Sequence, residues 1–120
     1  EHIDFTHPYN GELRKKIIRA ASSKSIKVIT SGTYGVTQGP RLETASEILR
    51  LAKDGCNIVG MTGMPEAALA KEKGMPYATI SVIVNPAAGL TNEELVLSDM
   101  LSVLSEGGKT CINILKAIED

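Results

Sequence analysis

Three short stretches of the chain place polar side chains directly after runs of apolar residues. They are "TQGPRLET" at residues 37–44, "MTGMPE" at 61–66 and "VNPAAG" at 84–89. They include a carboxylate at Glu43 and an amide at Asn85, groups that can orient a ligand by hydrogen bonding. The sequence has neither a Walker loop nor a G-x-G-x-x-G motif, and it indicates no Ser/His/Asp or Cys/His set for nucleophilic catalysis.

Each polar residue in these stretches also has a purely structural explanation. Asn85 precedes a proline, which restricts it to extended geometry, and turns at strand ends favour asparagine. Glu43 is expected in the first turn of a helix, where a carboxylate is stabilising in any protein. Thr62 either caps the helix that begins near Pro65 or holds an anion at its N-terminus. Arg41 is a phosphate ligand, a solvated arginine or half of an ion pair with a nearby carboxylate.

Helical periodicity predicts the elements that position these stretches. A helix after Asn10 carries Leu13, Ile17, Ala20 and Ala21 at helical spacing. A second covers residues 41–53, and Leu42 begins its apolar stripe, which predicts a core position for that side chain. A third starts in the second polar stretch. The C-terminal part predicts a kinked helix or two consecutive helices, separated at Gly107 and Gly108. One apolar stripe there consists of Leu97, Met100, Leu101 and Leu104.

Four segments rich in apolar and β-branched residues predict strands. They are residues 26–30, 33–38, 56–61 and 77–84. Strands that alternate with helices predict an α/β fold with a mixed, largely parallel sheet flanked by helices. Ligands of such sheets bind at the carboxyl ends of the strands. We therefore expect the three polar stretches to line one pocket.

Length and composition narrow the class of protein. The chain has 120 residues, of which 42% are apolar and 22% are charged. This length and composition predict a single globular domain over residues 1–120. The net charge of -1 favours neither nucleic acid nor an anionic membrane as a partner, and no apolar run is long enough for a membrane span. Cys56 and Cys111 lie in apolar stretches and predict reduced core residues in a cytoplasmic protein. His2 and His7 have no third ligand at a suitable spacing, so we expect no metal.

Three quoted runs, taken in order, resemble one known family. "HIDFTHPY", "GTYGVTQGPRLETASE" and "VGMTGMPEAALAKEKGMPYATISVIVN" are similar to the trimeric purine nucleoside phosphorylase and methylthioadenosine phosphorylase family, especially its bacterial S-methyl-5'-thioinosine phosphorylase branch. The resemblance covers nearly the whole chain but only the C-terminal half of the family fold. It implies phosphorolysis of a 6-oxopurine (methylthio)nucleoside, with S-methyl-5'-thioinosine as the expected substrate. Inorganic phosphate is then the co-substrate, and no cofactor or metal is required.

The resemblance also implies how the base is bound. Glu43 would accept the N1–H of a 6-oxopurine, and Asn85 would hydrogen-bond its N7 and O6 and stabilise the departing base. Leu42 stands where many members stack an aromatic ring on the base. Adenine-specific relatives carry an aspartate in place of Asn85 and another at Ala87. An amide can donate to O6 and N7, so Asn85 with Glu43 favours hypoxanthine or guanine.

Further positions correspond to the sugar and phosphate sites of the family. Met61 would lie against the ribose, and Thr62 would bind phosphate. Val96 and Leu97 would line the 5' end of the nucleoside, together with His2 lent by a neighbouring subunit of a homotrimer. In this family most phosphate ligands lie in the N-terminal half of the fold. That half is a missing partner segment, and catalysis would depend on it. The alternatives are a non-catalytic purine-binding or oligomerisation module, a methylthioadenosine phosphorylase, and a plain α/β scaffold.

Overall fold

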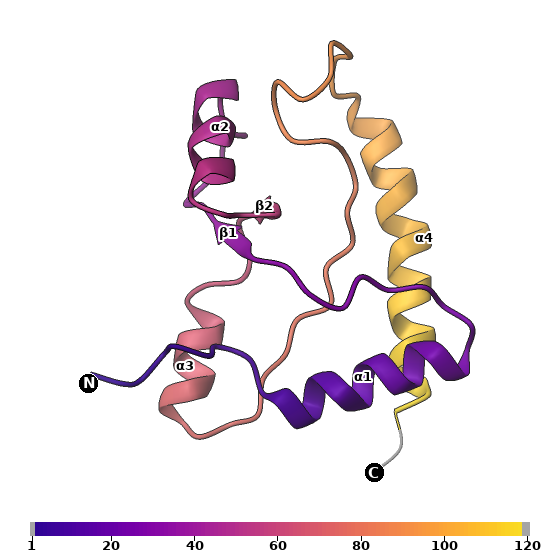
Figure 1. Ribbon diagram of the computed structural model, residues 1–120. Coiled ribbons are helices and arrows are strands. Elements are labelled where there is room, and N and C mark those ends of the chain that lie inside the picture. Colours follow the sequence, from indigo (N-terminus) through magenta and orange to yellow (C-terminus); the bar gives the residue numbers. More distant parts are fainter. Residues whose placement is uncertain (1, 119–120) are drawn as a thin grey trace.

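A computed structural model describes residues 2–118 as helices arranged around one small sheet (Figure 1). In chain order the elements are α1 (Gly11–Ser23), β1 (Tyr34–Val36), α2 (Ala45–Lys53), β2 (Ile58–Gly60), α3 (Glu66–Glu72) and α4 (Leu97–Lys116). The predicted α/β class is therefore confirmed. None of these helices combines the length and apolar character that a membrane span requires.

Helix α1 contributes to the buried core of the chain. The side chain of Asn10 accepts the N–H of Leu13 at 2.8 Å and so caps the start of the helix. Ala20 and Ala21 then pack with Ile114 of α4, and these three side chains are nearly inaccessible to solvent. Because alanine is small, the two helices can approach closely at this crossing.

Helix α2 begins later than the sequence predicted. A capping box fixes its start: the Thr44 side chain accepts the N–H of Glu47, and the Glu47 carboxylate accepts the N–H of Thr44. The helix therefore starts at Ala45 and not at Arg41. The expectation that Glu43 lies in the first turn is wrong, because Glu43 precedes the cap and Glu47 is the acidic residue of that turn.

The sheet consists of β1 and β2, which are parallel with Tyr34 opposite Ile58 and Val36 opposite Gly60. Two other predicted strands, residues 26–30 and 77–84, are not strands in this structure. A strand requires a hydrogen-bonding neighbour, and within residues 2–118 these segments have no ladder partner. Both run as long connections without helix or strand (Figure 1).

Helix α4 is continuous across the pair of glycines that was expected to interrupt it. A Cβ atom placed on Gly107 would lie 2.3 Å from Val82 Cγ1. The absence of a side chain at this position therefore lets the segment 77–84 approach the helix, and it does not end the helix. The apolar stripe at the start of α4 is not covered in this structure, since Leu97, Leu101 and Leu104 are all exposed.

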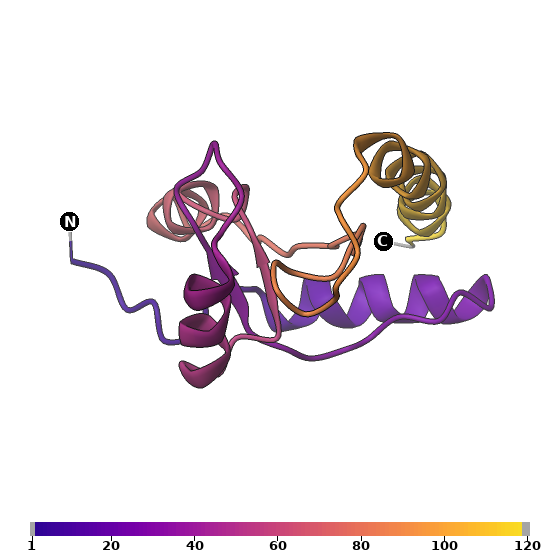
Figure 2. The same ribbon diagram turned by 90° about the horizontal axis from the view of Figure 1, so that it is seen from above.

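The arrangement is open for a chain of this length. Its radius of gyration is 15.7 Å, whereas about 14 Å is typical of a compact domain of 120 residues. Viewed from above, α2 and α3 lie next to the strand pair at one end of the molecule (Figure 2). Helix α4 lies at the opposite end, next to α1 (Figure 2). Many large apolar side chains are poorly covered, and Ile29 is 93% exposed.

Candidate functional site

The carboxylate of Glu43 is held at the end of the sheet by a residue that follows β1. The N–H of Thr37 donates to the carbonyl of Gly60 at 2.9 Å and so extends the pairing of β1 with β2. The Thr37 hydroxyl donates to Glu43 Oε1 at 2.6 Å. Glu43 is half-buried, so its carboxylate is a fixed hydrogen-bond acceptor at the carboxyl end of β1.

The three polar stretches lie close to one another. Gly39 has a φ of +63°, and a Cβ atom on it would lie 2.5 Å from the sulfur of Met61. Gly89 has a φ of +78°, and its Cβ atom would lie 2.6 Å from that of Ala45. The first stretch therefore contacts the second at Met61, and the third lies against the start of α2, two residues after Glu43.

Thr62 does not cap α3. The N-cap of α3 is Pro65, which makes no side-chain hydrogen bond, so the capping explanation for Thr62 is wrong. The N–H of Thr62 instead donates to the Tyr34 hydroxyl at 3.3 Å, and the two hydroxyl oxygens are 3.5 Å apart. Thr62 is exposed, and Gly60 and Gly63 allow the ring of Tyr34 to pack beside it.

Asn85 and Leu42 provide an amide and an apolar surface. Asn85 is half-buried, and its side-chain nitrogen donates to the carbonyl of Pro86 at 2.7 Å. An amide group has two N–H donors, so this contact leaves one donor and the side-chain oxygen for a ligand. Leu42 is 51% exposed, so its predicted core position is wrong. The late start of α2 leaves Leu42 on the preceding loop and not on a buried helix face.

Arg41 forms an ion pair. Its guanidinium donates from both terminal nitrogens to the carboxylate of Glu47, each at 2.9 Å. This hydrogen bonding, helped by the N–H of Thr44, lowers the pKa of Glu47 to about 2. The ion-pair explanation of Arg41 is therefore the one that the structure supports.

The residues expected near the 5' end are spread over distant parts of the chain. Val96 is the N-cap of α4 and Leu97 is its first residue, and both are exposed. His2 is exposed on the N-terminal arm, residues 2–9, which runs outward on the opposite side of the molecule from α4 (Figures 1 and 2). The arm is joined to the body by an N–H of Asn10 that donates to the carbonyl of Tyr77 at 2.8 Å. Within one chain these residues do not form one site.

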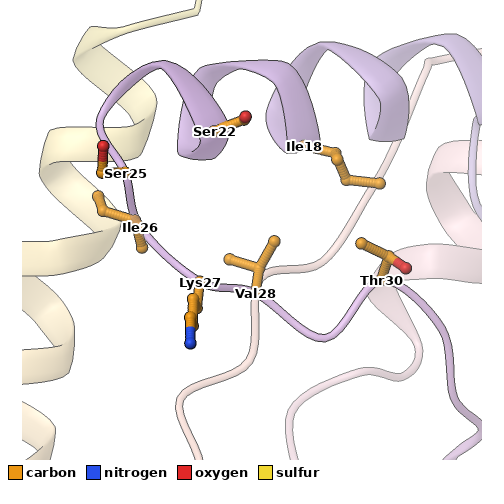
Figure 3. Close-up of a pocket in the computed structure, with 7 residues that line it drawn as sticks. All are labelled: Ile18, Ser22, Ser25, Ile26, Lys27, Val28 and Thr30. Atoms are coloured by element: carbon orange, nitrogen blue, oxygen red, sulfur yellow. The ribbon is translucent and has the colours of Figure 1, made fainter.

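A hollow of about 330 Å³ lies away from the polar stretches, between α1 and the extended segment that follows it (Figure 3). Ile18 and Ser22 of the helix face Val28 and Thr30 across it. None of the predicted site residues lines this hollow. No three His, Cys, Asp or Glu side chains gather among residues 2–118, and the absence of a metal from the reaction stays a prediction.

Sequence reasoning missed Thr37 and Tyr34. The hydroxyl of Thr37 holds Glu43, and the hydroxyl of Tyr34 accepts the N–H of Thr62. Both residues lie within the predicted strand of residues 33–38, and Thr37 also begins the first polar stretch, which was the available signal. Neither side chain stands out by type, since a threonine or a tyrosine is ordinary in a strand.

Comparison with known proteins assigns the family. The profile of the phosphorylase superfamily matches residues 1–118. The chain belongs to the phosphorylase superfamily. Curated relatives of the chain include a probable S-methyl-5'-thioinosine phosphorylase from Xanthomonas campestris pv. campestris. It is 50% identical over 103 residues, which are 85% of the chain and 41% of the relative.

Other similar proteins agree with this assignment. A 6-oxopurine nucleoside phosphorylase from Pyrococcus furiosus is 40% identical over 116 residues, which are 97% of the chain and 44% of the relative. The methylthioadenosine phosphorylase of Schistosoma mansoni, solved with adenine, superposes with a TM-score of 0.90 at 26% identity. The superposition covers 99% of this chain and 50% of the solved one. The chain therefore spans about half the length of the proteins that it matches.

Proposed function

We propose that this phosphorylase chain carries the base-binding side of an enzyme that cleaves a 6-oxopurine (methylthio)nucleoside with phosphate. S-methyl-5'-thioinosine is the substrate that we expect first, because a relative with that activity in its name is 50% identical. The observation that carries the proposal is the half-buried carboxylate of Glu43, fixed by Thr37 at the carboxyl end of β1. Ligands of parallel sheets bind at that end.

The hydrogen-bonding chemistry of the two key side chains favours a 6-oxopurine over adenine. An ionised carboxylate only accepts hydrogen bonds, so Glu43 suits the N1–H of hypoxanthine or guanine and not the bare N1 of adenine. Asn85 keeps one N–H donor for the edge of the base that carries the acceptors N7 and O6. The third stretch, which contains Asn85, lies against α2 close to Glu43, as the contact of Gly89 with Ala45 indicates. Exposed Leu42 gives the base an apolar face.

The reaction transfers the sugar from the purine to phosphate. A phosphate oxygen bonds to C1' while the bond from C1' to the purine nitrogen breaks, and that bond's electron pair leaves with the base. Asn85 stabilises the charge that develops on the base by donating to N7, and bound phosphate stabilises the cationic sugar. The departing base takes up the proton that hydrogen phosphate loses, so the products are free purine and (methylthio)ribose 1-phosphate, and no cofactor takes part.

Other groups of the chain complete the proposed site. Met61 lies against the ribose and Thr62 contributes to the phosphate site, on the loop that contacts the first polar stretch. Val96 and Leu97 line the 5' end together with His2 from a neighbouring subunit, because the arm carrying His2 points away from α4 within one chain. This arrangement requires an oligomer, which we expect to be a homotrimer. The N-terminal half of the enzyme supplies the remaining phosphate ligands. We place the enzyme in the cytoplasm, in purine salvage.

The test compares three nucleosides with the full-length enzyme and phosphate. We expect free base to be released from methylthioinosine and inosine faster than from methylthioadenosine. Asn85→Ala should lower turnover by about 10²–10³, the effect of removing one donor to a developing charge. A preference for methylthioadenosine would overturn the base assignment. Purine binding without any release of base would instead favour a non-catalytic binding module.

A further inference from the structure

The hydroxyl of Thr37 has two acceptors within reach but only one proton to donate. Glu43 Oε1 lies 2.6 Å away, and the carbonyl oxygen of Gly60 lies 3.4 Å away. The shorter contact is with the charged acceptor, and hydrogen bonds to charged groups are the stronger ones. The proton of this hydroxyl is therefore directed at the carboxylate.

The backbone of Thr37 is fixed where its hydroxyl is needed. Its N–H donates to Gly60 at 2.9 Å, one residue beyond the last pair of the sheet, Val36 and Gly60. Gly60 in turn lies under the ring of Tyr34, where a Cβ atom would be 2.5 Å from the tyrosine oxygen. Thr37 is thus hydrogen-bonded to the end of the sheet, which is a rigid support for a functional group.

Glu43 has no comparable support from its own backbone. It lies before the cap of α2, on the loop that contains Gly39 and Pro40, and the helix does not include it. Among the described residues, the hydrogen bond that the Glu43 carboxylate makes is the one from Thr37. The orientation of this side chain therefore depends on a hydroxyl six residues earlier in the chain.

We propose that Thr37 is a positioning residue that determines base selectivity by holding Glu43 Oε1, which leaves Oε2 to accept the N1–H of the purine. The inference rests on the proposed function, because it assigns Glu43 to the base. Without the hydroxyl the carboxylate can rotate, and it loses the orientation that distinguishes an N1–H from a bare N1. Thr37 itself does not touch the substrate.

The test uses the full-length enzyme with Thr37→Val, which keeps the shape but removes the hydroxyl, and Thr37→Ser, which keeps the hydroxyl. We expect Thr37→Val to lower kcat/KM for the 6-oxopurine nucleoside by about 10- to 100-fold, the scale for a hydrogen bond to a charged group. Thr37→Ser should stay within about threefold of the wild type, since it retains that bond. Thr110→Val is the matched control, because the exposed Thr110 hydroxyl donates to the carbonyl of Glu106 within α4, away from the proposed site. It should leave kcat/KM unchanged.

A second readout separates positioning from general structural damage. In a Glu43→Gln background, Thr37→Val should have little further effect, because the carboxylate that the hydroxyl orients has already gone. An equal loss in both backgrounds would overturn the inference, and so would wild-type kcat/KM in Thr37→Val. Thr37→Ala provides a second hydroxyl-free variant if valine disturbs the end of the strand, and it must show the same dependence on Glu43.

The two hypotheses fail in different ways. If the wild type cleaves 6-oxopurine nucleosides and Glu43→Gln impairs it while Thr37→Val does not, only the role of Thr37 is wrong. If Glu43→Gln leaves cleavage of 6-oxopurine nucleosides unchanged, the proposed base site is itself wrong.

Discussion

Arg41 holds the Glu47 carboxyl by two hydrogen bonds, and this contact makes stability depend on pH. The pKa of Glu47 is lowered from 4.5 to about 2 in the folded protein. The stabilisation is therefore present above the unfolded value of 4.5 and is lost as the pH falls toward 2. We expect Glu47→Gln to be less stable than the wild type at neutral pH, and the difference should vanish in acid. Urea unfolding of both proteins from neutral pH down toward pH 2 measures the difference in unfolding free energy. A difference that persists at low pH would contradict the ion-pair account.

Gly39 has a left-handed backbone conformation and also a close neighbour. Comparison with Gly74 separates the effect of backbone strain from the effect of the contact. Both have a φ of +63°, but a Cβ atom on Gly74 meets nothing within 4 Å, whereas one on Gly39 meets the sulfur of Met61. Gly74→Ala should cost about 1–2 kcal/mol of unfolding free energy from backbone strain alone. Gly39→Ala should cost more and should also lower activity by displacing Met61. Equal losses of stability would show that the contact with Met61 is unimportant.

Candidate residues for the site could be chosen from the sequence where their type was unusual for their place. An amide after the apolar run of residues 77–84 drew attention to Asn85, and the polar stretch before α2 drew attention to Glu43. Thr37 was missed because its importance depends on one contact, with Glu43, which no pattern of residue types reveals. The helical position of Glu43 was wrong because the capping box of Thr44 and Glu47 outweighs the apolar periodicity that seemed to begin at Leu42.

The adjacent glycines of α4 occupy different environments, which gives a prediction for this helix. A Cβ atom on Gly108 meets nothing within 4 Å, but one on Gly107 lies 2.3 Å from Val82. Gly108→Ala should therefore stabilise the protein by up to about 1 kcal/mol through helix propensity. Gly107→Ala should destabilise it by about 1–3 kcal/mol through overpacking. Thermal unfolding of the two variants measures the contrast, and stabilisation by both would mean that Val82 does not pack on α4.

Helices were predicted better than strands because a helix makes its hydrogen bonds within one segment. Helix α1 appears where its cap at Asn10 and its apolar spacing predicted it. A strand depends on a neighbour elsewhere in the chain, and so composition alone could not show which strands would pair. Of the four predicted, the segments around β1 and β2 pair, and residues 26–30 and 77–84 do not.

The whole molecule leaves apolar surface uncovered, and this gives a prediction about the rest of the enzyme. Ile29 and Ile83 lie on the two unpaired segments and are 93% and 58% exposed. We expect strands from the remaining half of the enzyme to pair with these segments, because the chain covers 41% of one relative and 50% of a solved one. Hydrogen exchange should then show protected amides in residues 26–30 and 77–84 of the full-length enzyme.

The same measurement on residues 1–120 alone provides the control. There the two segments should exchange fast, and the exposed strand edges should favour aggregation. A monodisperse 120-residue monomer with protected amides in both segments would contradict the expectation of missing strands. The α/β class and the order of the elements were predictable at this scale, but the open shape was not, since no residue pattern states which part of a sheet is present.

The most direct test of the base site is a crystal structure of the full-length enzyme with hypoxanthine bound. The account predicts that the purine lies at the carboxyl ends of β1 and β2. Glu43 Oε2 should be within hydrogen-bond distance of N1, the Thr37 hydroxyl should still be on Oε1, and the Asn85 amide should face N7 and O6. A base bound elsewhere, or Glu43 and Asn85 turned away from each other into solvent, would contradict it.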